Sequence, residues 1–277
     1  MPLTLLQQLA AIPVRTVDVA SDRVEYRQAG APGAHASVLV LLHGIGSASA
    51  SWLAQLQRLA GGRRVLAWNA PGYGNSSALP QESPLARDYA ARMWEWLDAI
   101  DVGPITLVGH SLGALMAAAA TVMQPQRVRH LALLAPALGY GAAEPALREA
   151  KLRDRLANLH SLGPAGMAEK RGAAMLSPQA SAEQVAFTKS VMAQIDPHGY
   201  TQAARLLAGG NLMQDLARIA CPITVASGSQ DSITPPQACL RAAAAARTGL
   251  IDLGPVGHAC ALEAADAVCA LLDGAAA

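Results

Sequence analysis

A glycine-flanked serine, Gly109-His110-Ser111-Leu112-Gly113, lies between an apolar run at 105–108 and an alanine-rich segment at 114–121. The apolar run predicts a buried strand, and the alanine-rich segment predicts a helix. A Gly-x-Ser-x-Gly sequence between a strand and a helix is typical of a nucleophile elbow, a strained turn that exposes the serine hydroxyl. The motif therefore predicts an α/β fold in which Ser111 stands at the carboxyl edge of a parallel sheet.

Apolar runs that predict strands alternate with segments of helical spacing along most of the chain. The helix expected at 83–100 has Ser83 as its N-cap and Pro84 at the first helical position. The alternation predicts a mostly parallel eight-stranded sheet with helices on both faces. The expected strands are 15–20, 23–28, 38–42, 64–68, 105–108, 128–134, 223–226 and 250–253, and the other core helices are 52–59, 114–124, 236–246 and 262–272.

The segment 137–210 interrupts this alternation after the sixth expected strand. Its parts at 145–159, 182–195 and 200–208 have helical apolar spacing, and no strand is obvious among them. We interpret the segment as a helical cap, with the core formed by residues 1–136 and 211–277.

Composition and charge favour a globular protein that acts on a small molecule. The 277 residues are 52% hydrophobic and 15% charged, which suits a chain with a large buried core. A formal net charge of +1 gives no argument for a nucleic acid or an anionic membrane as partner, because such binding normally shows as a basic patch. We expect a monomer or homodimer with a small-molecule substrate.

Three features indicate a cytoplasmic protein. No lysine or arginine precedes Arg15, so the N-terminal segment lacks the charged region of a secretory signal. The apolar runs are shorter than the roughly 20 residues of a membrane-spanning helix, so none is expected. The cysteines have no C-x-x-C spacing, and three lie in apolar sequence typical of buried free thiols. They are Cys221, Cys239, Cys260 and Cys269.

A serine hydroxyl becomes a good nucleophile only when a base removes its proton, so Ser111 requires a histidine and a group that orients it. Of the seven histidines, His258 has the expected position, because it follows the last expected strand through a short loop. Asp231 follows the strand at 223–226, which gives the chain order Ser, Asp, His expected for an elbow. Two alternatives remain: Asp231 as a helix-capping or turn residue, and Asp252 as the acid.

Acyl transfer also needs donors that face the oxyanion of the tetrahedral intermediate. The backbone N–H of Leu112, directly after the serine, is one candidate. The second is the N–H of Ile45, in the loop His43-Gly44-Ile45-Gly46 after a buried strand. An ordinary strand-ending turn is the alternative interpretation of that loop. This chemistry uses no metal ion or organic cofactor, and none is expected.

Five segments in chain order resemble the successive signatures of the α/β-hydrolase family, and the resemblance covers nearly the whole chain. It implies an α/β-hydrolase sheet with a cap after the sixth strand, and a serine hydrolase that acylates Ser111. One departure is Asn69, where many relatives carry an aspartate that is usually structural. The segments are Leu41-Leu42-His43-Gly44, Asn69-Ala70-Pro71-Gly72-Tyr73-Gly74-Asn75-Ser76, Gly109-His110-Ser111-Leu112-Gly113, Gly228-Ser229-Gln230-Asp231 and Gly257-His258.

In size and cap position the chain is similar to the meta-cleavage-product C–C bond hydrolases within that family. That subgroup commonly has a Ser-Gly-Pro-Gly-like oxyanion loop, an asparagine before the nucleophile and a tryptophan after the catalytic histidine. This chain has Ile45-Gly46-Ser47-Ala48, His110 and Ala259 at those positions. The differences weaken the prediction of C–C cleavage.

The expected cap carries a basic stretch that could contact a substrate carboxylate. We favour instead a solvated helix face in which Glu149 and Asp154 are the partners, because charged helical positions are mostly exposed. The basic residues are Arg148, Lys151, Arg153 and Arg155. Candidate apolar liners, each more simply explained as core, are Trp52, Met116, Met167, Met175, Phe187 and Met192.

Three functions follow from these residues. The first is hydrolysis of a small carboxylic ester or lactone through an acyl-enzyme on Ser111. The second function has the same fold but cleaves a different bond, either the C–C bond of a vinylogous diketone or the acyl bond of an amide or thioester. The third is a receptor-like protein that binds a ligand on the same fold without turning it over, since fold does not fix function.

Overall fold

One sheet forms the centre of the molecule, of which the computed structural model describes residues 2–30 and 37–274. The strand order is β1-β2-β4-β3-β5-β6-β7-β8. Only the β1–β2 and β2–β4 pairs are antiparallel, so the prediction of a mostly parallel eight-stranded sheet is confirmed. The strands are β1 (Val14–Val19), β2 (Asp22–Ala29), β3 (Ser37–Leu42), β4 (Arg63–Trp68), β5 (Ile105–His110), β6 (Val128–Leu134), β7 (Ile223–Ser227) and β8 (Leu250–Asp252).

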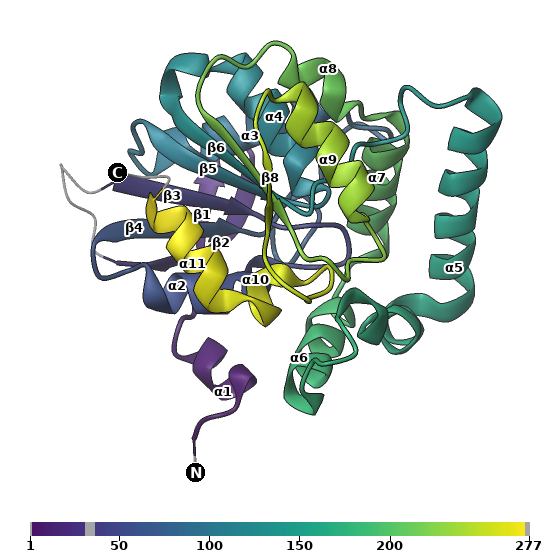
Figure 1. Cartoon of the computed structure of the whole chain (residues 1–277), viewed down its shortest axis with the longest axis horizontal. Coiled ribbons are helices and arrows are strands. Elements are labelled where there is room, and N and C mark those ends of the chain that lie inside the picture. The colour runs from purple at the N-terminus through teal and green to yellow at the C-terminus, as the bar shows by residue number, and fades with distance from the viewer. Residues whose placement is uncertain (1, 31–36, 275–277) are drawn as a thin grey trace.

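The central strands are apolar because helices cover both faces of the sheet (Figure 1). In β3, Leu39 and Leu41 pack on one face, whereas Val40 and Leu42 pack on the other, as the two-residue period of a strand requires. Helices α3, α4 and α9 cover the face of Val40 and Leu42, and α2, α10 and α11 cover the opposite face. These helices are α2 (Leu53–Arg58), α3 (Ala86–Ala99), α4 (Gly113–Met123), α9 (Pro236–Ala245), α10 (Cys260–Glu263) and α11 (Ala265–Gly274).

Two helices begin differently from the sequence expectation. α3 starts at Ala86, because the Asp88 carboxylate accepts a 2.7 Å hydrogen bond from the Leu85 N–H and closes the first turn there. The prediction of Ser83 as N-cap with Pro84 in the first turn was therefore wrong. A further helix, α1 (Leu5–Ala10), lies before β1 and was not predicted.

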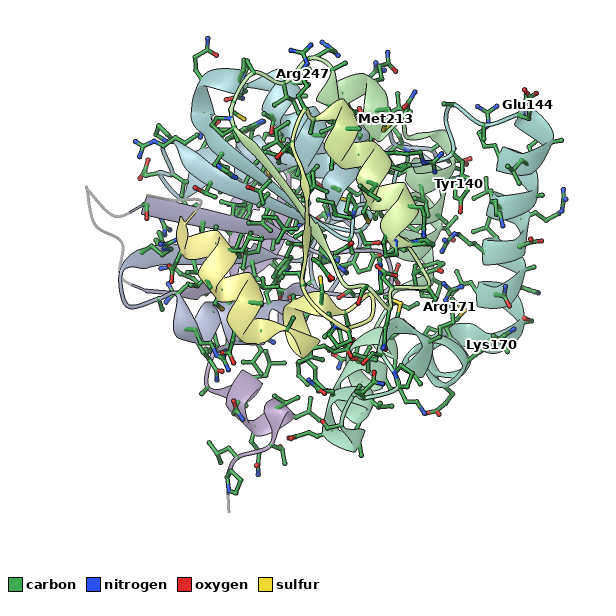
Figure 2. The ribbon with its side chains drawn as sticks, viewed as in Figure 1. Tyr140, Glu144, Lys170, Arg171, Met213 and Arg247 are labelled. Carbon is green, nitrogen blue, oxygen red and sulfur yellow. The ribbon has the colours of Figure 1, made fainter. Side chains whose placement is uncertain are left out.

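Helices occupy the chain between β6 and β7, within and just beyond the range 137–210. α5 stands at the right of Figure 1, where it contacts mainly α6 and α7; Figure 2 shows Glu144 and Lys170 at its opposite ends. α5 runs past its expected end and bends at Gly163, which has φ 62° and precedes Pro164. The inserted helices are α5 (Pro145–Arg171), α6 (Ala182–Met192), α7 (Pro197–Gly209) and α8 (Leu212–Leu216).

The main chain of helix α7 packs directly against the main chain of the loop after β4. A side chain at Gly199 would collide with the Gly72 carbonyl oxygen, and one at Gly72 would collide with the Gly199 backbone. Gln202 on α7 adds hydrogen bonds of 2.7 Å to the carbonyls of Leu79 and Gln81. Backbones this close require glycine at both positions, which fixes α7 relative to the sheet.

The four cysteines are free thiols. Cys239, Cys260 and Cys269 are buried, and Cys221 is half-buried. None of the helices in the described part of the chain combines the length and the apolar character that crossing a bilayer requires.

Candidate active site

Ser111 lies in the sharp turn between β5 and α4 with φ 53°, a left-handed conformation that is strained for a residue with a side chain. Main-chain bonds hold the turn: the Ser111 N–H donates to the Leu134 carbonyl at 3.0 Å, and the Ser111 carbonyl accepts from the Ala137 N–H at 3.1 Å. A Cβ at Gly44 would lie 2.9 Å from Ser111 Cβ. Glycine at this position therefore lets the loop after β3 approach the serine.

His258 and Asp231 come together from two loops at the same edge of the sheet. His258 Nδ1 donates to Asp231 Oδ2 at 2.8 Å, and both residues are buried. Asp252, the alternative acid, is exposed and instead accepts a 2.9 Å hydrogen bond from the Gly254 N–H. The structure thus places Asp231, and not Asp252, against the histidine.

Thr234 also belongs to this cluster, and the sequence did not single it out. Its Oγ1 lies 2.8 Å from Asp231 Oδ2, 3.1 Å from His258 Nδ1 and 3.0 Å from the Ala135 carbonyl. Asp231 Oδ1 accepts further bonds from the N–H groups of Ile233 and Thr234, at 2.8 and 2.9 Å. The signal for Thr234 was its place three residues after the aspartate, where a loop can fold back on its own carboxylate.

The Asp231 carboxylate is held in its charged form. Burial alone would raise its pKa, but hydrogen bonding and charge attraction from His258, with hydrogen bonds from Thr234, outweigh burial and lower the pKa below its ordinary value. An ionised carboxylate at 2.8 Å fixes the proton of the imidazole on Nδ1 and leaves Nε2 free to accept another.

Two other buried histidines support the neighbouring loops. His110 Nε2 donates to the His258 carbonyl at 2.8 Å, and its ring packs edge-on against Trp52. His43 Nδ1 donates to the Gly44 carbonyl at 2.8 Å, while its Nε2 accepts from the Ala70 N–H at 3.0 Å. Burial lowers the pKa of His43 to about 4, and burial together with the nearby His258 lowers that of His110 to about 3. Both rings are therefore neutral at pH 7.

The backbone amides of Ile45 and Leu112 lie beside Ser111, one in the loop after β3 and one at the start of α4. Within the described residues, neither N–H donates a hydrogen bond to another protein group. Two unpartnered N–H groups next to a serine hydroxyl can donate hydrogen bonds to an oxyanion. Among the hydrogen bonds of the described residues, none joins Ser111 Oγ to His258.

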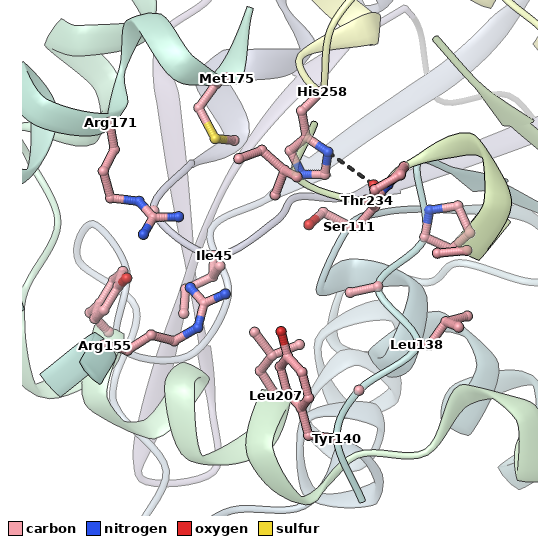
Figure 3. A pocket seen from close by; sticks show the side chains of 18 of the residues that line it. Ile45, Ser111, Leu138, Tyr140, Arg155, Arg171, Met175, Leu207, Thr234 and His258 are labelled. Atoms are coloured by element: carbon pink, nitrogen blue, oxygen red, sulfur yellow. Dashed lines mark hydrogen bonds between the residues drawn. The ribbon is translucent and has the colours of Figure 1, made fainter. Parts of the chain in front are cut away.

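A cavity of about 240 Å³ contains the Ser111 hydroxyl and the His258 ring (Figure 3). Much of its wall is apolar, with Leu138, Leu207 and methionines of the inserted helices. A smaller apolar cavity of about 40 Å³ lies on the other side of Ile45. Of the six residues that the sequence suggested as apolar liners, Met116 is buried in the core. The other five line one or both of these cavities: Trp52, Met167, Met175, Phe187 and Met192.

The basic residues of α5 divide into two groups. Lys151 and Arg153 are exposed, as expected for a solvated helix face. Arg155 lines the cavity instead, and Arg171, which the sequence did not single out, lines it as well. The expectation that Glu149 and Asp154 pair with these residues is wrong for the part of the chain that the structure describes, because neither forms an ion pair there.

A model of the alpha/beta hydrolase family matches residues 39–271, and the chain belongs to this family of hydrolases. Among its relatives, (E)-2-((N-methylformamido)methylene)succinate hydrolase from Acinetobacter baylyi is 28% identical over 197 residues, or 70% of this chain and 72% of the relative. An acetyltransferase component of the acetoin cleaving system from Pseudomonas putida is 30% identical over 83% of this chain, which spans 60% of that longer protein.

Solved structures confirm the fold over nearly the whole chain. The enol-lactonase from Burkholderia xenovorans LB400 superposes with a TM-score of 0.84 at 21% identity, covering 94% of this chain and 98% of the enzyme. A hydrolase from Pseudomonas aeruginosa superposes with a TM-score of 0.82 at 25% identity, covering 94% and 97%. The resemblance to α/β-hydrolases that the motifs predicted is confirmed.

Proposed function

We propose that the protein hydrolyses a small carboxylic ester or lactone through an acyl-enzyme on Ser111. Ser111 Oγ attacks the carbonyl carbon while His258 Nε2 takes its proton, and Asp231 stabilises the imidazolium that forms. The N–H groups of Ile45 and Leu112 bind the oxyanion of the tetrahedral intermediate. As the carbonyl re-forms, the bond to the alkoxide leaving group breaks, and His258 returns the proton to that oxygen.

Deacylation follows the same route with water as the nucleophile. His258 Nε2 takes a proton from the water as its oxygen attacks the acyl carbon, and the same two amides bind the second oxyanion. The bond to Ser111 Oγ then breaks, His258 returns the proton to the serine, and the carboxylic acid leaves.

The observation that carries the proposal is the convergence of three chain segments on one cavity. A serine with φ 53° and a histidine line this cavity, and the far nitrogen of the histidine bonds a buried aspartate at 2.8 Å. A purely structural role for the strained serine would not require a histidine bonded to a buried aspartate in the same cavity. The Acinetobacter relative, named for hydrolysis of a substituted succinate, supports a small-molecule substrate.

The test uses p-nitrophenyl esters of short acids. The wild-type protein is expected to hydrolyse them and to be labelled by a fluorophosphonate at Ser111. Ser111→Ala should lose both properties, whereas Ser232→Ala, at an exposed serine of the Asp231 loop, should keep both. Turnover that persists in Ser111→Ala would remove the proposed nucleophile.

The two alternative functions predict different outcomes of the same assay. A receptor-like protein would be folded but would neither turn over the esters nor react with the fluorophosphonate. A C–C hydrolase would cleave a vinylogous diketone with a higher kcat/KM than any ester in the panel. Either result would contradict ester hydrolysis as the function.

A further inference from the structure

Helix α5 directs two guanidinium groups into the candidate cavity. Figure 3 shows Arg155 and Arg171 pointing into the cavity from one side, with the Ser111 hydroxyl and the His258 ring on the other. A third arginine, the exposed Arg241 of α9, also lines the cavity. The described residues that line it include no aspartate and no glutamate, so the cavity is cationic although the chain is nearly neutral.

The bend in α5 is what brings Arg155 and Arg171 together. In a straight helix, residues 16 positions apart are about 24 Å apart along the axis and about 160° apart around it, so they face nearly opposite directions. In α5 the non-helical backbone of Gly163, at φ 62° and ψ 177°, interrupts the helix between the two arginines, and Pro164 follows. The kink therefore places side chains from two helical segments in one cavity.

Neither guanidinium has an anionic partner among the residues that the structure describes. The ion pairs of the described residues include neither Arg155 nor Arg171, and no hydrogen bond from either side chain to a protein acceptor is present there. Arg155 Nη1 is fully buried without a hydrogen-bond partner. Arg92 also has one unpartnered nitrogen, but its other nitrogens bond Asp22 and Glu95.

Two unpaired cations held together are costly for the free protein. Both side chains are half-buried, and a charge withdrawn from water destabilises the fold unless a partner, water or an ion compensates it. A carboxylate fits this site, because its two oxygens match the paired N–H groups of a guanidinium and its charge offsets both cations. An apolar substrate would leave the two groups unpaired in the closed complex.

We propose that Arg155 and Arg171 form a carboxylate subsite, and that the substrate is a small acid whose carboxylate lies across the cavity from the scissile carbonyl. This inference rests on the proposed ester hydrolysis at Ser111 and names its substrate class. The cavity of about 240 Å³ limits the substrate to a short acid. Leu138 and Leu207 would contact the apolar chain between its two functional groups.

The experiment compares two esters that differ in their distal group. Mono-p-nitrophenyl adipate carries a free carboxylate, and p-nitrophenyl heptanoate has an apolar chain of similar length. The wild-type protein is expected to show a kcat/KM at least about 10-fold higher for the adipate ester. A third ester with a terminal phosphonate separates a carboxylate subsite from a phosphate subsite, and its preference over the adipate ester would overturn the proposal.

Variants assign the preference to the two arginines. Arg155→Met and Arg171→Met are each expected to lower the ratio of the two kcat/KM values about 10-fold. The ratio is formed within each variant, so a loss of folded protein cancels. Arg153→Met, at an exposed position of the same helix, is the matched control and should leave the ratio unchanged. An unchanged ratio in both cavity variants would overturn the proposal, as would a wild-type ratio of one.

A binding measurement keeps this inference separate from the proposed hydrolysis. Adipate should raise the melting temperature of Ser111→Ala and should fail to raise that of Ser111→Ala combined with Arg155→Met. If no ester is hydrolysed but this shift is seen, the proposed function fails and the subsite stands. If the esters are hydrolysed without a carboxylate preference or a shift, the subsite fails and the proposed function stands.

Discussion

The cavity has two walls whose polar side chains are held differently. We call them the sheet wall, which carries Thr234 and His258, and the α5 wall, which carries Arg155 and Arg171. On the sheet side, Asp231, Thr234 and His258 are buried and bond one another at 2.8 to 3.1 Å. On the α5 side, Arg155 and Arg171 reach the cavity with no bonded partner among the described residues. Under the proposed function, the reacting groups are preorganised, whereas the arginines gain a partner only when the ligand binds.

The sharpest test of the sheet wall is Asp231→Asn. An amide in place of the carboxylate no longer fixes the Nδ1 proton of His258, so the ring loses its ability to accept a proton at Nε2. We expect kcat for ester hydrolysis to fall about 10⁴-fold. Asp252→Asn, at the exposed alternative acid, is the control and should have no effect. A larger loss in Asp252→Asn would reverse the assignment of the acid.

Two buried histidines that support the loops next to this wall, His43 and His110, should make the fold sensitive to acid. Burial lowers the pKa of His43 to about 4 and of His110 to about 3, so the unfolded chain binds these protons first as pH falls. Each neutral ring makes its full contribution to the free energy of unfolding above pH 6.5. That contribution is lost as the pH falls from 6.5 toward the pKa of the ring in the folded protein. Between pH 7 and 5 each ring should lower the free energy of unfolding by about 2 kcal/mol.

Urea unfolding of His110→Asn at both pH values measures this contribution. The variant cannot titrate at residue 110, so its loss of stability between pH 7 and 5 should be smaller than that of wild type by about 2 kcal/mol. The test compares the change in the free energy of unfolding between pH 7 and pH 5, and not its value at either pH, because the substitution also changes packing against Trp52. An equal loss in both proteins would contradict a buried neutral His110.

Thr234 tests whether the sheet wall depends on residues beyond those that react. Thr234→Val keeps the shape of the side chain but removes the hydroxyl that contacts Asp231 and His258. We expect kcat/KM to fall about 10-fold. Thr234→Ser restores the hydroxyl and should restore most of the activity, whereas a role in packing alone would leave the valine variant active and would impair the serine variant, which lacks the methyl group.

The smallest effect is expected on the opposite wall. Arg155→Met replaces an unpaired, partly buried cation by an apolar side chain, so the free protein should gain stability, on the order of 1 kcal/mol. The melting temperature without ligand measures this gain, with Arg153→Met as the exposed control. A lower melting temperature in Arg155→Met would mean that the arginine stabilises the free protein, and the contrast between the walls would disappear.

The sequence signals for the sheet and for the candidate residues at its edge are local. Each central strand is a continuous apolar run. Ser111 directly follows β5, and Asp231 and His258 lie in the loops after β7 and β8, so their meeting at one edge follows from topology. The helix termini were less predictable. The start of α3 depends on Asp88 reaching back to the Leu85 N–H, and this competes with the proline signal at Pro84.

The α5 wall was not predictable from local pattern. Arg155 and Arg153 are two positions apart and have the same chemistry, but one lines the cavity and the other is exposed. Arg171 comes to the same cavity only because the backbone at Gly163 leaves the helix. Which arginine faces the substrate depends on a kink and on tertiary packing, and neither appears in charge or hydropathy patterns.

The Gly72–Gly199 contact distinguishes two kinds of support within the inserted helices. α7 touches the loop after β4 through main chain at two glycines, so neither position tolerates any other residue. α5 has α6 and α7 as its main neighbours and carries Arg155 and Arg171, two of the three arginines that line the cavity. For redesign, α7 should be kept unchanged, whereas substitutions in α5 could change the substrate preference while the sheet stays the same.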